Sequence, residues 1–443
     1  MLKSLNLQGV GPVRDLSATF GERLNVITGD NGLGKSFLLD VCFWVLTGSW
    51  PGRRMAIPDS GSTSSTIVYD VKSKTKSASG KGSYNFKSQT WSRQRGRPPM
   101  AGLVLYAAID GSFAVWDPAR NYWRDARFRH PDAFDPQWSR AFQFPPESLV
   151  DYEEVGTGTI RRDVANGLEE AGQVLCNGLI ADWSEWFYQR SSQSVANAFG
   201  YLEEVISVLS HPSEPIRCEE PQKVFLTDSR KFPTLRMPYG LVPHPHWSAG
   251  VKRIINFSYL LVWAWVSHLD AAKLRKEQPT DRIILLVDEV EAHLHPKWQR
   301  TILPAILRVV QKLQPDIAIQ ILAATHSPLV LASVEPHFDE EKDQLFSFSI
   351  DPSQPASKMV SFDPLPWAVH GDVVGWLTSD IFGLEQARSR EAERAIEAAE
   401  AYMRGDTASL PDSLTTKEAI TAELRRVLAG LDPFWPRWIV EAK

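Results

Sequence analysis

The sequence has few of the features that secreted, disulfide-bonded or membrane proteins require. Its 443 residues include only three cysteines, at positions 42, 176 and 218, and this wide spacing indicates reduced thiols and excludes a disulfide framework. The run LLVWAWV that begins at Leu260 is far too short to cross a membrane, and the chain opens without a signal-peptide pattern. We therefore expect a cytoplasmic protein without membrane contact.

An excess of one charge, internal repeats and sustained heptads are also missing. The formal net charge is −5 at pH 7, so any surface for nucleic acid has to be local. Hydrophobic residues make up 43% and charged residues 23% of the chain, as in a soluble globular protein. The helical segments between about 163 and 210 show no heptad pattern, which excludes a long coiled-coil arm.

A glycine-rich segment near the N-terminus, TGDNGLGKSFLLD at 28–40, carries the strongest chemical signal. The apolar run RLNVI before it predicts a buried strand, and SFLLDVCFWVL after it predicts a helix. A strand, the pattern G-x-x-x-x-G-K-S and a helix together predict a loop that holds nucleotide phosphates. The residues that we expect to bind ATP in this loop are Gly29, Asp30, Asn31, Gly32, Leu33, Gly34, Lys35 and Ser36.

Two side chains of this loop have separate expected roles. Lys35 can reach the β- and γ-phosphates and assist catalysis, and the Ser36 hydroxyl can bind Mg²⁺. The glycines permit backbone conformations and a close approach to phosphate that side chains would block. We therefore predict ATP and Mg²⁺ as the cofactors.

A second motif places two carboxylates at the end of a strand. In RIILLVDEVEAHLHP the apolar run at 283–287 predicts a strand buried on both faces of a parallel sheet. Asp288 can bind the Mg²⁺ that Ser36 also binds, and Glu289 can polarise the attacking water as a general base. We favour these roles over a merely solvent-facing acidic pair because the phosphate-binding loop is present.

The next strand ends in a histidine. KWQRTILPAILRVVQKL predicts a crossover helix that Pro304 would kink or divide, and IAIQILAATHSP predicts the strand that follows. In such a βαβ unit, ligands gather at the carboxyl ends of the strands. We therefore favour a catalytic role for His326, as a donor to the γ-phosphate, over that of a histidine packed in the core.

Between these motifs, HWSAGVKRIINFSYLLVWAW predicts a helix whose N-terminus can meet an anion. Ser248 can cap the helix, Gly250 leaves its N-terminus open, and Lys252 and Arg253 lie close by. An ordinary capped amphipathic helix is the alternative interpretation.

Together these motifs resemble those of ABC-type ATPases. Gly29 to Ser36 resembles a Walker A motif, IILLVDE a Walker B motif with its catalytic glutamate, SAGVKR the signature motif, and His326 the switch histidine. The string DEVEAHLHP followed by THSP is similar to the OLD and RecF-like branch of AAA-family ATPases. That branch includes the ATPase subunits of phage-defence systems such as Septu and PARIS. The specific resemblance covers about 1–50 and 240–330.

The resemblance implies a head-to-tail homodimer, or a higher homo-oligomer, with ATP at the interface. Ser248 and Gly250 would then contact the nucleotide that the partner subunit binds. Trp247 and Ala249 stand where the family's LSGGQ has leucine and glycine, so this contact departs from the family pattern. Gln143 in RAFQFPPE is the best candidate for the glutamine loop, and a plain strand residue is the alternative.

OLD nucleases carry a C-terminal TOPRIM domain with a D-x-D acidic set, and this chain has no D-x-D or H-N-H after His326. We therefore expect that it cuts nothing itself and acts with a separate effector protein. The expected function is that of an ATPase working as a nucleotide-driven dimer switch in anti-phage defence. Rival functions are DNA repair of the RecF type, the ATP-binding subunit of a membrane transporter, and a nucleotide-held scaffold that scarcely hydrolyses ATP.

One local surface could bind double-stranded DNA. Between residues 71 and 100 the sequence has eight lysines and arginines and no acid, with Tyr84, Phe86 and Trp91 among them. The cations could neutralise phosphates while the rings stack on bases, or the segment is a solvated hairpin at a sheet edge. The sequence is compatible with both the DNA-binding surface and the solvated hairpin. The cations are Lys72, Lys74, Lys76, Lys81, Lys87, Arg93, Arg95 and Arg97.

Histidine pairs occur in PHPHW and in EAHLHP, but neither has a cysteine or acid set at zinc-ligand spacing. We therefore expect no metal other than Mg²⁺. Near the C-terminus, a helix expected from Leu384 to Met403 is either a solvated helix with one packed side or a docking helix. The tail DPFWPRW offers Phe434, Trp435 and Trp438 as aromatic anchors, although a packed tail is favoured.

We predict an α/β fold, a P-loop NTPase of the ABC-ATPase-head type with a mixed sheet. Short alternating segments between residues 65 and 117, separated by glycine turns, predict an antiparallel meander. The predicted parts are an ATP-binding lobe with this meander at 1–162, a short helical insertion at 163–212, a lobe with signature helix, Walker B motif and switch histidine at 213–345, and a helical extension at 346–443.

Overall fold

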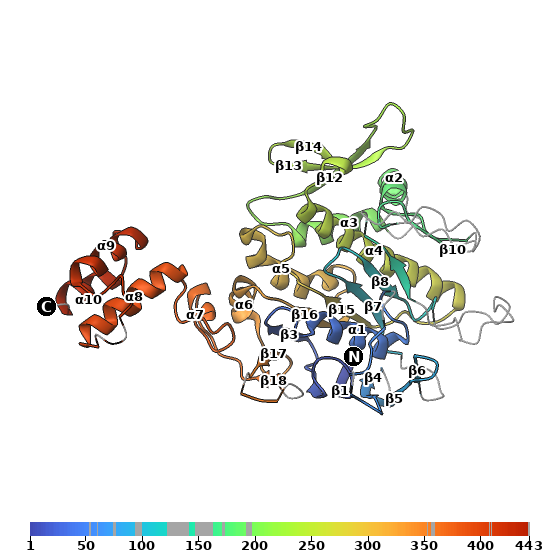
Figure 1. The fold of residues 1–443 in the computed structure, drawn as a ribbon. Helices are drawn as coiled ribbons and strands as arrows, with labels where there is room; N and C mark the ends of the chain where they lie inside the picture. The colour runs from blue at the N-terminus through green and yellow to red at the C-terminus, as the bar shows by residue number, and fades with distance from the viewer. Residues whose placement is uncertain are drawn as a thin grey trace. The chain divides into compact units, whose positions relative to one another are not determined.

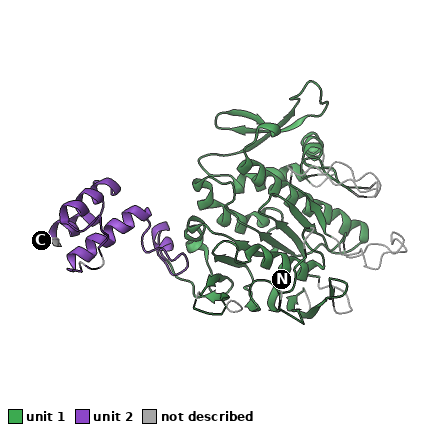
Figure 2. Ribbon diagram, viewed as in Figure 1, with its two compact units in different colours: residues 1–369 green, residues 370–443 purple. Residues whose placement is uncertain are grey.

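The computed structural model contains two compact units, residues 1–369 and residues 370–443 (Figure 2). The first unit is built from two large β-sheets with helices between and around them (Figure 1). The structure describes residues 1–52, 55–59, 61–73, 77–93, 100–121, 141–146, 163–170, 173–191, 197–351, 353–355, 359–406, 408 and 410–441.

An eight-stranded mixed sheet forms the centre of the first unit. Its strand order is β18-β17-β3-β16-β15-β7-β8-β9, and the strands from β17 to β7 run parallel to one another. The edge strands pair in the antiparallel direction, so the predicted α/β fold with a mixed sheet is confirmed. The strands are β3 (Leu24–Gly29), β7 (Leu103–Ala107), β8 (Phe113–Trp116), β9 (Phe142–Phe144), β15 (Arg282–Val287), β16 (Ala318–Ala324), β17 (Gln344–Ile350) and β18 (Val360–Leu365).

A second, five-stranded antiparallel sheet has the order β2-β1-β4-β5-β6. The antiparallel meander predicted over residues 65–117 is confirmed for β4, β5 and β6. It is wrong only for β7 and β8, which pair in the antiparallel direction within the eight-stranded sheet. Every residue of β7 is buried, which suits a central strand, whereas β4 alternates between buried and more exposed positions. The strands are β1 (Leu2–Gln8), β2 (Asp15–Thr19), β4 (Thr66–Lys72), β5 (Ser77–Asn85) and β6 (Thr90–Arg93).

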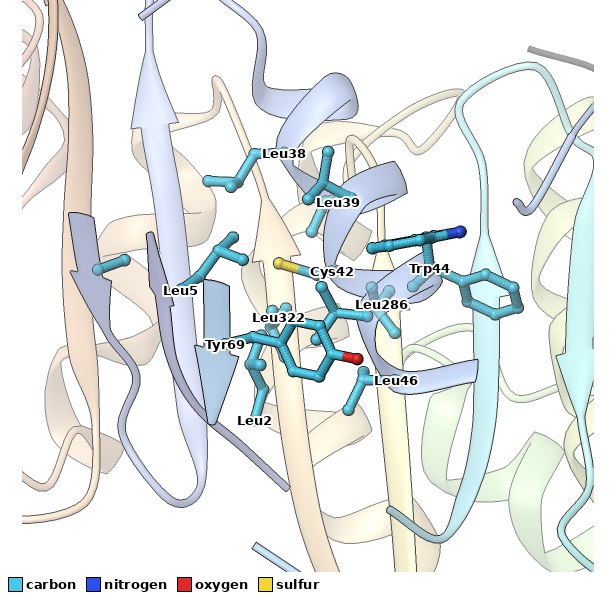
Figure 3. Packing of buried hydrophobic residues seen from close by; sticks show 14 of the residues in the cluster. Leu2, Leu5, Leu38, Leu39, Cys42, Trp44, Leu46, Tyr69, Leu286 and Leu322 are labelled. Carbon is cyan, nitrogen blue, oxygen red and sulfur yellow. The ribbon is translucent and has the colours of Figure 1, made fainter. Parts of the chain in front are cut away.

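Helix α1 (Lys35–Thr47) lies between the two sheets (Figure 3). One hydrophobic cluster joins it to Leu2 and Leu5 of β1, to Leu286 of β15 and to Leu322 of β16. Ten of the 13 residues of α1 are buried, as expected for a helix that a sheet covers on each side. This packing holds the start of α1 at the ends of the central strands.

Helices α3, α4 and α5 cover the other face of the eight-stranded sheet (Figure 1). Neighbouring strand residues face opposite sides: Leu286 packs in the cluster with α1, whereas Val287 lines a small cavity with Ile254 of α4 and Ile302 of α5. Helix α5 is not divided at Pro304, which is itself buried. In the described ranges no helix is long and apolar enough to cross a bilayer. The elements are α3 (Ala198–Leu209), α4 (Ala249–Arg275), α5 (Pro296–Val309) and η4 (Val310–Lys312).

The region predicted as a helical insertion contains α2 and α3 and also a short strand pair, β10 and β11. A three-stranded sheet of β12, β13 and β14 follows and leads through η3 into α4. The buried Tyr259 of α4 ties this region to the unit, since its hydroxyl donates to Asp182 Oδ2 at 2.7 Å. The elements are α2 (Leu179–Gln189), β10 (Leu168–Glu170), β11 (Gln173–Cys176), β12 (Arg217–Gln222), β13 (Phe232–Met237), β14 (Gly240–Pro243) and η3 (His244–His246).

The first unit ends later than the sequence suggested. The predicted boundary between 345 and 346 falls inside β17, and β17 and β18 extend the eight-stranded sheet, so that boundary is wrong. The physical reason is aromatic packing, because Phe346 and Phe348 of β17 lie with ring centroids 5.1 Å and 4.6 Å from Phe362 of β18. Between β16 and β17 the chain forms α6 (Pro328–Val334) and η5 (Glu335–His337).

The second unit is a small helical module with its own hydrophobic cluster. Phe434 and Trp438 are buried in that cluster, as the packed-tail interpretation requires, and Trp435 is partly exposed. The helix expected from Leu384 begins only after Ser389, whose side chain accepts a hydrogen bond from Ala392 N. The helices are α7 (Val373–Leu377), α8 (Arg390–Met403), α9 (Lys417–Val427) and α10 (Phe434–Glu441).

One buried amide joins the two sheets of the first unit. Gln320 of β16 is fully buried, and its Oε1 accepts a hydrogen bond from Leu2 N at 2.8 Å. Its Nε2 donates to the carbonyl oxygens of Leu2 and Gly21, each at 2.8 Å. Gln320 therefore satisfies main-chain groups of β1 that the core would otherwise leave unpaired.

We predict that Gln320→Leu lowers the free energy of unfolding by about 2 to 4 kcal/mol, because it leaves buried amide and carbonyl groups without partners. Urea unfolding followed by tryptophan fluorescence measures this loss. The exposed Gln311 supplies the control, since Gln311→Leu should change stability by less than about 0.5 kcal/mol. Equal losses in the two variants would contradict the prediction.

Candidate functional site

The carboxyl ends of three neighbouring parallel strands, β3, β16 and β15, form the edge at which the predicted residues meet. The glycine-rich loop follows β3, Asp288 and Glu289 follow β15, and His326 comes two residues after β16. Loops that leave adjacent parallel strands lie close together. The structure therefore gathers the phosphate-binding loop, the two carboxylates and the histidine in one site.

Three glycines shape the loop between β3 and α1. Gly29, Gly32 and Gly34 have φ angles of 122°, 81° and 105°, a region that favours glycine. A Cβ on Gly29 would lie 2.2 Å from the Phe348 carbonyl oxygen, and one on Gly34 would lie 2.6 Å from Pro12 Cγ. The loop thus needs glycine for its curvature at all three positions and for its packing at two of them.

The N-terminus of α1 is suited to bind phosphate. Its first hydrogen bond runs from Leu38 N to Gly34 O at 2.9 Å, so the preceding amide groups have no partner within the helix. No side chain caps this end, and no acidic residue lies in the first turn. An anion at this position would meet both the free amide groups and the positive end of the helix dipole.

Lys35 is held inside the same loop. Its Nζ donates to the carbonyl oxygens of Gly29 at 2.9 Å and Asp30 at 2.7 Å. Burial lowers the pKa of Lys35, and the nearby carboxylates Glu289 and Asp288 oppose that shift. The neighbouring Asn31 and Gly32 are exposed, whereas Leu33 is a core residue at 6% exposure.

Asp288 and Ser36 fit a magnesium site. Asp288 is 1% exposed, and burial raises its pKa while a hydrogen bond from Ser36 opposes the rise. Its Oδ1 atom is buried and has no hydrogen-bond partner within the described residues, although buried polar atoms are nearly always paired. A hard cation bound by this oxygen and the Ser36 hydroxyl would satisfy it.

Glu289 and His326 form the pair predicted to act on the γ-phosphate. Glu289 has a φ of 43°, a conformation that costs a residue with a side chain about 1 to 3 kcal/mol. Its Oε1 lies 3.6 Å from His326 Nε2, and both side chains remain partly exposed to the site. Burial, and then the charge of Lys35, lower the pKa of His326, so the neutral ring predominates at pH 7.

Glu291 is a functional candidate that sequence reasoning missed. Its Oε1 accepts a hydrogen bond from His326 N at 2.6 Å, and its Oε2 accepts one from Thr325 Oγ1 at 2.8 Å. Burial raises the pKa of Glu291, and these hydrogen bonds oppose the rise. Both carboxylate oxygens of Glu291 already accept hydrogen bonds from the protein. Glu289 is therefore the glutamate of this motif whose carboxylate is available to accept a hydrogen bond from a water molecule.

Asp40, one helical turn after Ser36, is a second acid that was missed. Burial raises its pKa to about 7, and a hydrogen bond from Tyr106 of β7 opposes that rise. The negative charge of Asp288 acts in the same direction as burial. A pKa of about 7 places Asp40 near neutral pH, close enough to Asp288 for the two charges to interact. The only sequence signal for it was an acid within an otherwise apolar helix.

The signature-like helix α4 contacts the same strand end within one chain. Ser248 caps it as predicted, with Ser248 Oγ accepting from Val251 N at 3.4 Å. A Cβ on Gly250 would lie 2.6 Å from the His293 carbonyl oxygen, so glycine is required for packing there. Ser248 and Ala249 are exposed and are accessible to a partner molecule.

Arg253 links α4 to the ends of β7 and β15. Its pKa is lowered by burial, and Asp288 is the first of several carboxylates that oppose the shift. Five donors on one planar group let a buried arginine satisfy several carbonyl oxygens at once. The guanidinium donates to the carbonyl oxygens of Ala108 at 3.2 Å, Ile109 at 3.3 Å, Asp288 at 2.6 Å and Glu289 at 3.1 Å.

Trp247, which departs from the family pattern, is a core residue. It is 6% exposed, its Nε1 donates to Val242 O at 2.8 Å, and its ring lies 4.8 Å from that of His244.

Among the residues that the structure describes, no group of three or more His, Cys, Asp and Glu side chains is arranged to hold a metal ion.

Gln143 lies in β9, and its Nε2 donates to Trp50 O at 2.8 Å. Its assignment to a glutamine loop stays a prediction, since both a loop glutamine and a plain strand residue are compatible with this bond.

The basic segment 71–100 is described only in part. Lys72 pairs with Glu22 at 3.1 Å, whereas Lys81 and Lys87 are exposed. The Tyr84 ring lies 5.3 Å from Trp91 and 5.1 Å from Phe86, so these rings contact one another. Lys74, Lys76, Arg95, Arg97 and the side chain of Arg93 lie outside the described residues.

Two stretches of the chain match models of known domain families. Residues 4–98 match the model described as "AAA domain", and residues 239–332 match the one described as "AAA domain, putative AbiEii toxin, Type IV TA system". These stretches contain the phosphate-binding loop, the α4 motif, the carboxylate pair and His326. The matches confirm the resemblance to AAA-family ATPases that the motifs indicate.

Two curated proteins and several solved structures are similar to the chain. Septu protein PtuA of Bacillus thuringiensis is 22% identical over 408 residues, which cover 88% of this chain and 86% of PtuA. The Retron Vc95 probable ATPase of Vibrio cholerae serotype O1 biovar El Tor is 42% identical over 82 residues, but the match spans only 15% of that protein and 18% of this chain.

The SMC head domain from Thermotoga maritima matches with a TM-score of 0.38 and 16% identity, over 83% of this chain and 99% of that one. The recombination mediator RecF with ATP matches with a TM-score of 0.37 and 12% identity, over 82% of this chain and 97% of that one.

We predict that Gly250→Ala destabilises the isolated chain without nucleotide by about 1 to 3 kcal/mol, because the added methyl group meets the His293 carbonyl. Thermal or urea unfolding of the nucleotide-free protein measures this loss. Gly430→Ala is the matched control, since a Cβ there meets nothing within 4 Å. Unchanged stability of Gly250→Ala would show that the close packing at α4 is not needed.

Proposed function

We propose that this chain, an ABC-type ATPase with AAA-family domains, is a nucleotide-driven dimer switch of an anti-phage defence system that acts with a separate effector protein. One observation carries the ATPase part: a single strand edge holds the phosphate loop, the unpaired Asp288 Oδ1 beside Ser36, and Glu289 3.6 Å from His326. These are the parts that phosphoryl transfer to water needs.

In this proposal each residue has one task. The loop amides and Lys35 hold the β- and γ-phosphates, and Ser36 and Asp288 hold Mg²⁺, which polarises the phosphate oxygens when it is bound. Glu289 accepts a proton from the attacking water. His326, neutral at pH 7, donates a hydrogen bond to the γ-phosphate as negative charge shifts in the transition state.

Dimer formation would complete the site. The exposed Ser248 and the first turn of α4 would meet the γ-phosphate bound by the partner subunit, as in the family that the motifs resemble. Gly250 then serves two purposes, since it packs against His293 within its own chain and leaves the α4 terminus open. The defence setting is supported by the similarity to PtuA, which extends over 86% of that protein.

We expect Lys35→Ala to abolish steady-state ATP hydrolysis, because the phosphates lose their cation. Glu289→Gln should retain ATP binding, lower kcat by at least about 100-fold, and accumulate an ATP-bound dimer. Phosphate release and light scattering after size exclusion measure the two effects. The exposed Glu340 supplies the control, as Glu340→Gln should behave like the wild type. A Glu289→Gln variant that behaves like the wild type would instead indicate a nucleotide-held scaffold.

Direct regulation by DNA is the second candidate, which the exposed Lys81 and Lys87 favour. If the segment binds double-stranded DNA, DNA should stimulate hydrolysis at low salt, and the stimulation should fall steeply as salt rises. Lys81→Gln with Lys87→Gln should reduce it, whereas Lys72→Gln should have less effect because Lys72 already pairs with Glu22. A Lys35-dependent rate that is indifferent to DNA would point to control by a protein partner.

A further inference from the structure

The short segment that carries His326 is fixed from two sides. Glu291 accepts hydrogen bonds from the His326 amide at 2.6 Å and from the Thr325 hydroxyl at 2.8 Å. On the other side, Ser327 Oγ donates to Gln299 Oε1 of α5 at 2.8 Å. Gln299 Nε2 in turn donates to Leu294 O at 3.0 Å, so the turn after β15 and the start of α5 together hold this segment.

The contact between Glu291 and His326 is to the main chain of the histidine itself. β16 ends at Ala324, and the last hydrogen bond to the sheet comes from Thr325 N, which donates to Ile27 O of β3 at 3.0 Å. The amide of the next residue, His326, donates to Glu291 instead of to a strand. The carboxylate of Glu291 is mostly removed from water, where a charged acceptor makes short and strong hydrogen bonds. Glu291 therefore holds the His326 amide, and the ring that extends from it lies 3.6 Å from Glu289 and also contacts the main chain of Gly29.

We propose that Glu291 is a positioning residue for hydrolysis, which sets the His326 ring against Glu289 and the γ-phosphate by holding the Thr325–His326 main chain. The proposal rests on the role of His326 given under Proposed function. Lys35 donates its hydrogen bonds to Gly29 O and Asp30 O, and the charge of Glu291 is the smallest of the four carboxylate effects on the pKa of Lys35. Loss of Glu291 should therefore affect the chemical step much more than ATP binding.

Two substitutions test this arrangement with little change in shape. In Glu291→Gln the amide group keeps one acceptor oxygen and presents an N–H where an acceptor stood, so one of the two hydrogen bonds is lost. Thr325→Val removes the hydroxyl, which donates to Glu291 and also accepts a hydrogen bond from Ser327 N at 3.0 Å, and Thr325→Ser keeps both hydrogen bonds. We expect Glu291→Gln to lower kcat about 10- to 100-fold, as a small misplacement of a catalytic group does, with KM for ATP within about twofold of wild type.

The decisive measurement is a double-mutant cycle on kcat with His326→Ala. If Glu291 acts through His326, Glu291→Gln adds nothing to the loss caused by His326→Ala, because the ring that it positions is gone. Thr325→Val should lower kcat in part and Thr325→Ser should restore it. The exposed Glu341 gives the matched control, Glu341→Gln, with wild-type kcat and thermal stability.

The outcomes separate the two proposals. A lowered rate for His326→Ala together with a wild-type rate for Glu291→Gln, or losses that multiply in the double variant, overturns the positioning role alone. A wild-type rate for His326→Ala overturns the role of the histidine and the positioning role with it. If Glu291→Gln unfolds, the same cycle run with Thr325→Val against His326→Ala decides between these outcomes, because the valine matches threonine in size.

Discussion

Glu289 and His293 have left-handed backbone conformations, with φ angles of 43° and 63°, and they shape the turn between β15 and α5. Each costs about 1 to 3 kcal/mol in a residue with a side chain, so the surrounding contacts must hold this turn in place. Arg253 binds the carbonyl oxygens at 288 and 289, and Gly250 packs on the carbonyl of His293. Helix α4 contacts this strained turn through Arg253 and Gly250, and the His326 segment contacts it through Glu291. The turn therefore connects α4, the carboxylate pair and the His326 segment.

The charged groups around this turn form a compact and largely buried set. Burial raises the pKa values of Asp288, Glu291 and Asp40 and lowers those of Lys35 and Arg253. Each shift in that list disfavours the charged form, so the site is costly to keep charged by its own residues alone. A bound triphosphate with a divalent cation would supply charges of both signs. Binding of nucleotide should therefore stabilise the folded site as well as start the chemistry.

Much of the fold and the site was readable from local pattern. The glycine loop, the apolar run before Asp288 and the placement of His326 after the next strand each depend on residues close together in the chain, and the structure places them as expected. The helix cap at Ser248 also follows a local rule. Each of these features is determined by residues within a short stretch of the sequence, so it can be predicted without the contacts between distant segments.

The misses have a different character. β7 joins the parallel sheet because β15 lies next to it, and β17 enters the sheet beside β3, pairings between segments far apart in sequence. Glu291 looks like an ordinary surface residue in the sequence, since an acid in a turn has many uses. Arg253 was expected beside an anion at the start of the helix, but its guanidinium binds main-chain carbonyl oxygens. Their partners are main-chain groups, namely the His326 amide and four carbonyl oxygens. Every residue has a main-chain carbonyl, and nearly every residue has a main-chain amide. The sequence therefore contains no residue type that would identify these groups as hydrogen-bond partners.

Gly250 shows why a motif alone cannot tell a ligand contact from a packing contact. In the signature motif of the family it resembles, a glycine at this helix start leaves room for a phosphate of the partner subunit. In this chain the same absence of a side chain is already required by the His293 carbonyl, 2.6 Å from where a Cβ would stand. Because His293 lies in the turn that carries Glu289, a displacement of the start of α4 would reach the Glu289 carboxylate through direct packing. In the proposed dimer, this packing would give a contact at the start of α4 a physical route to Glu289.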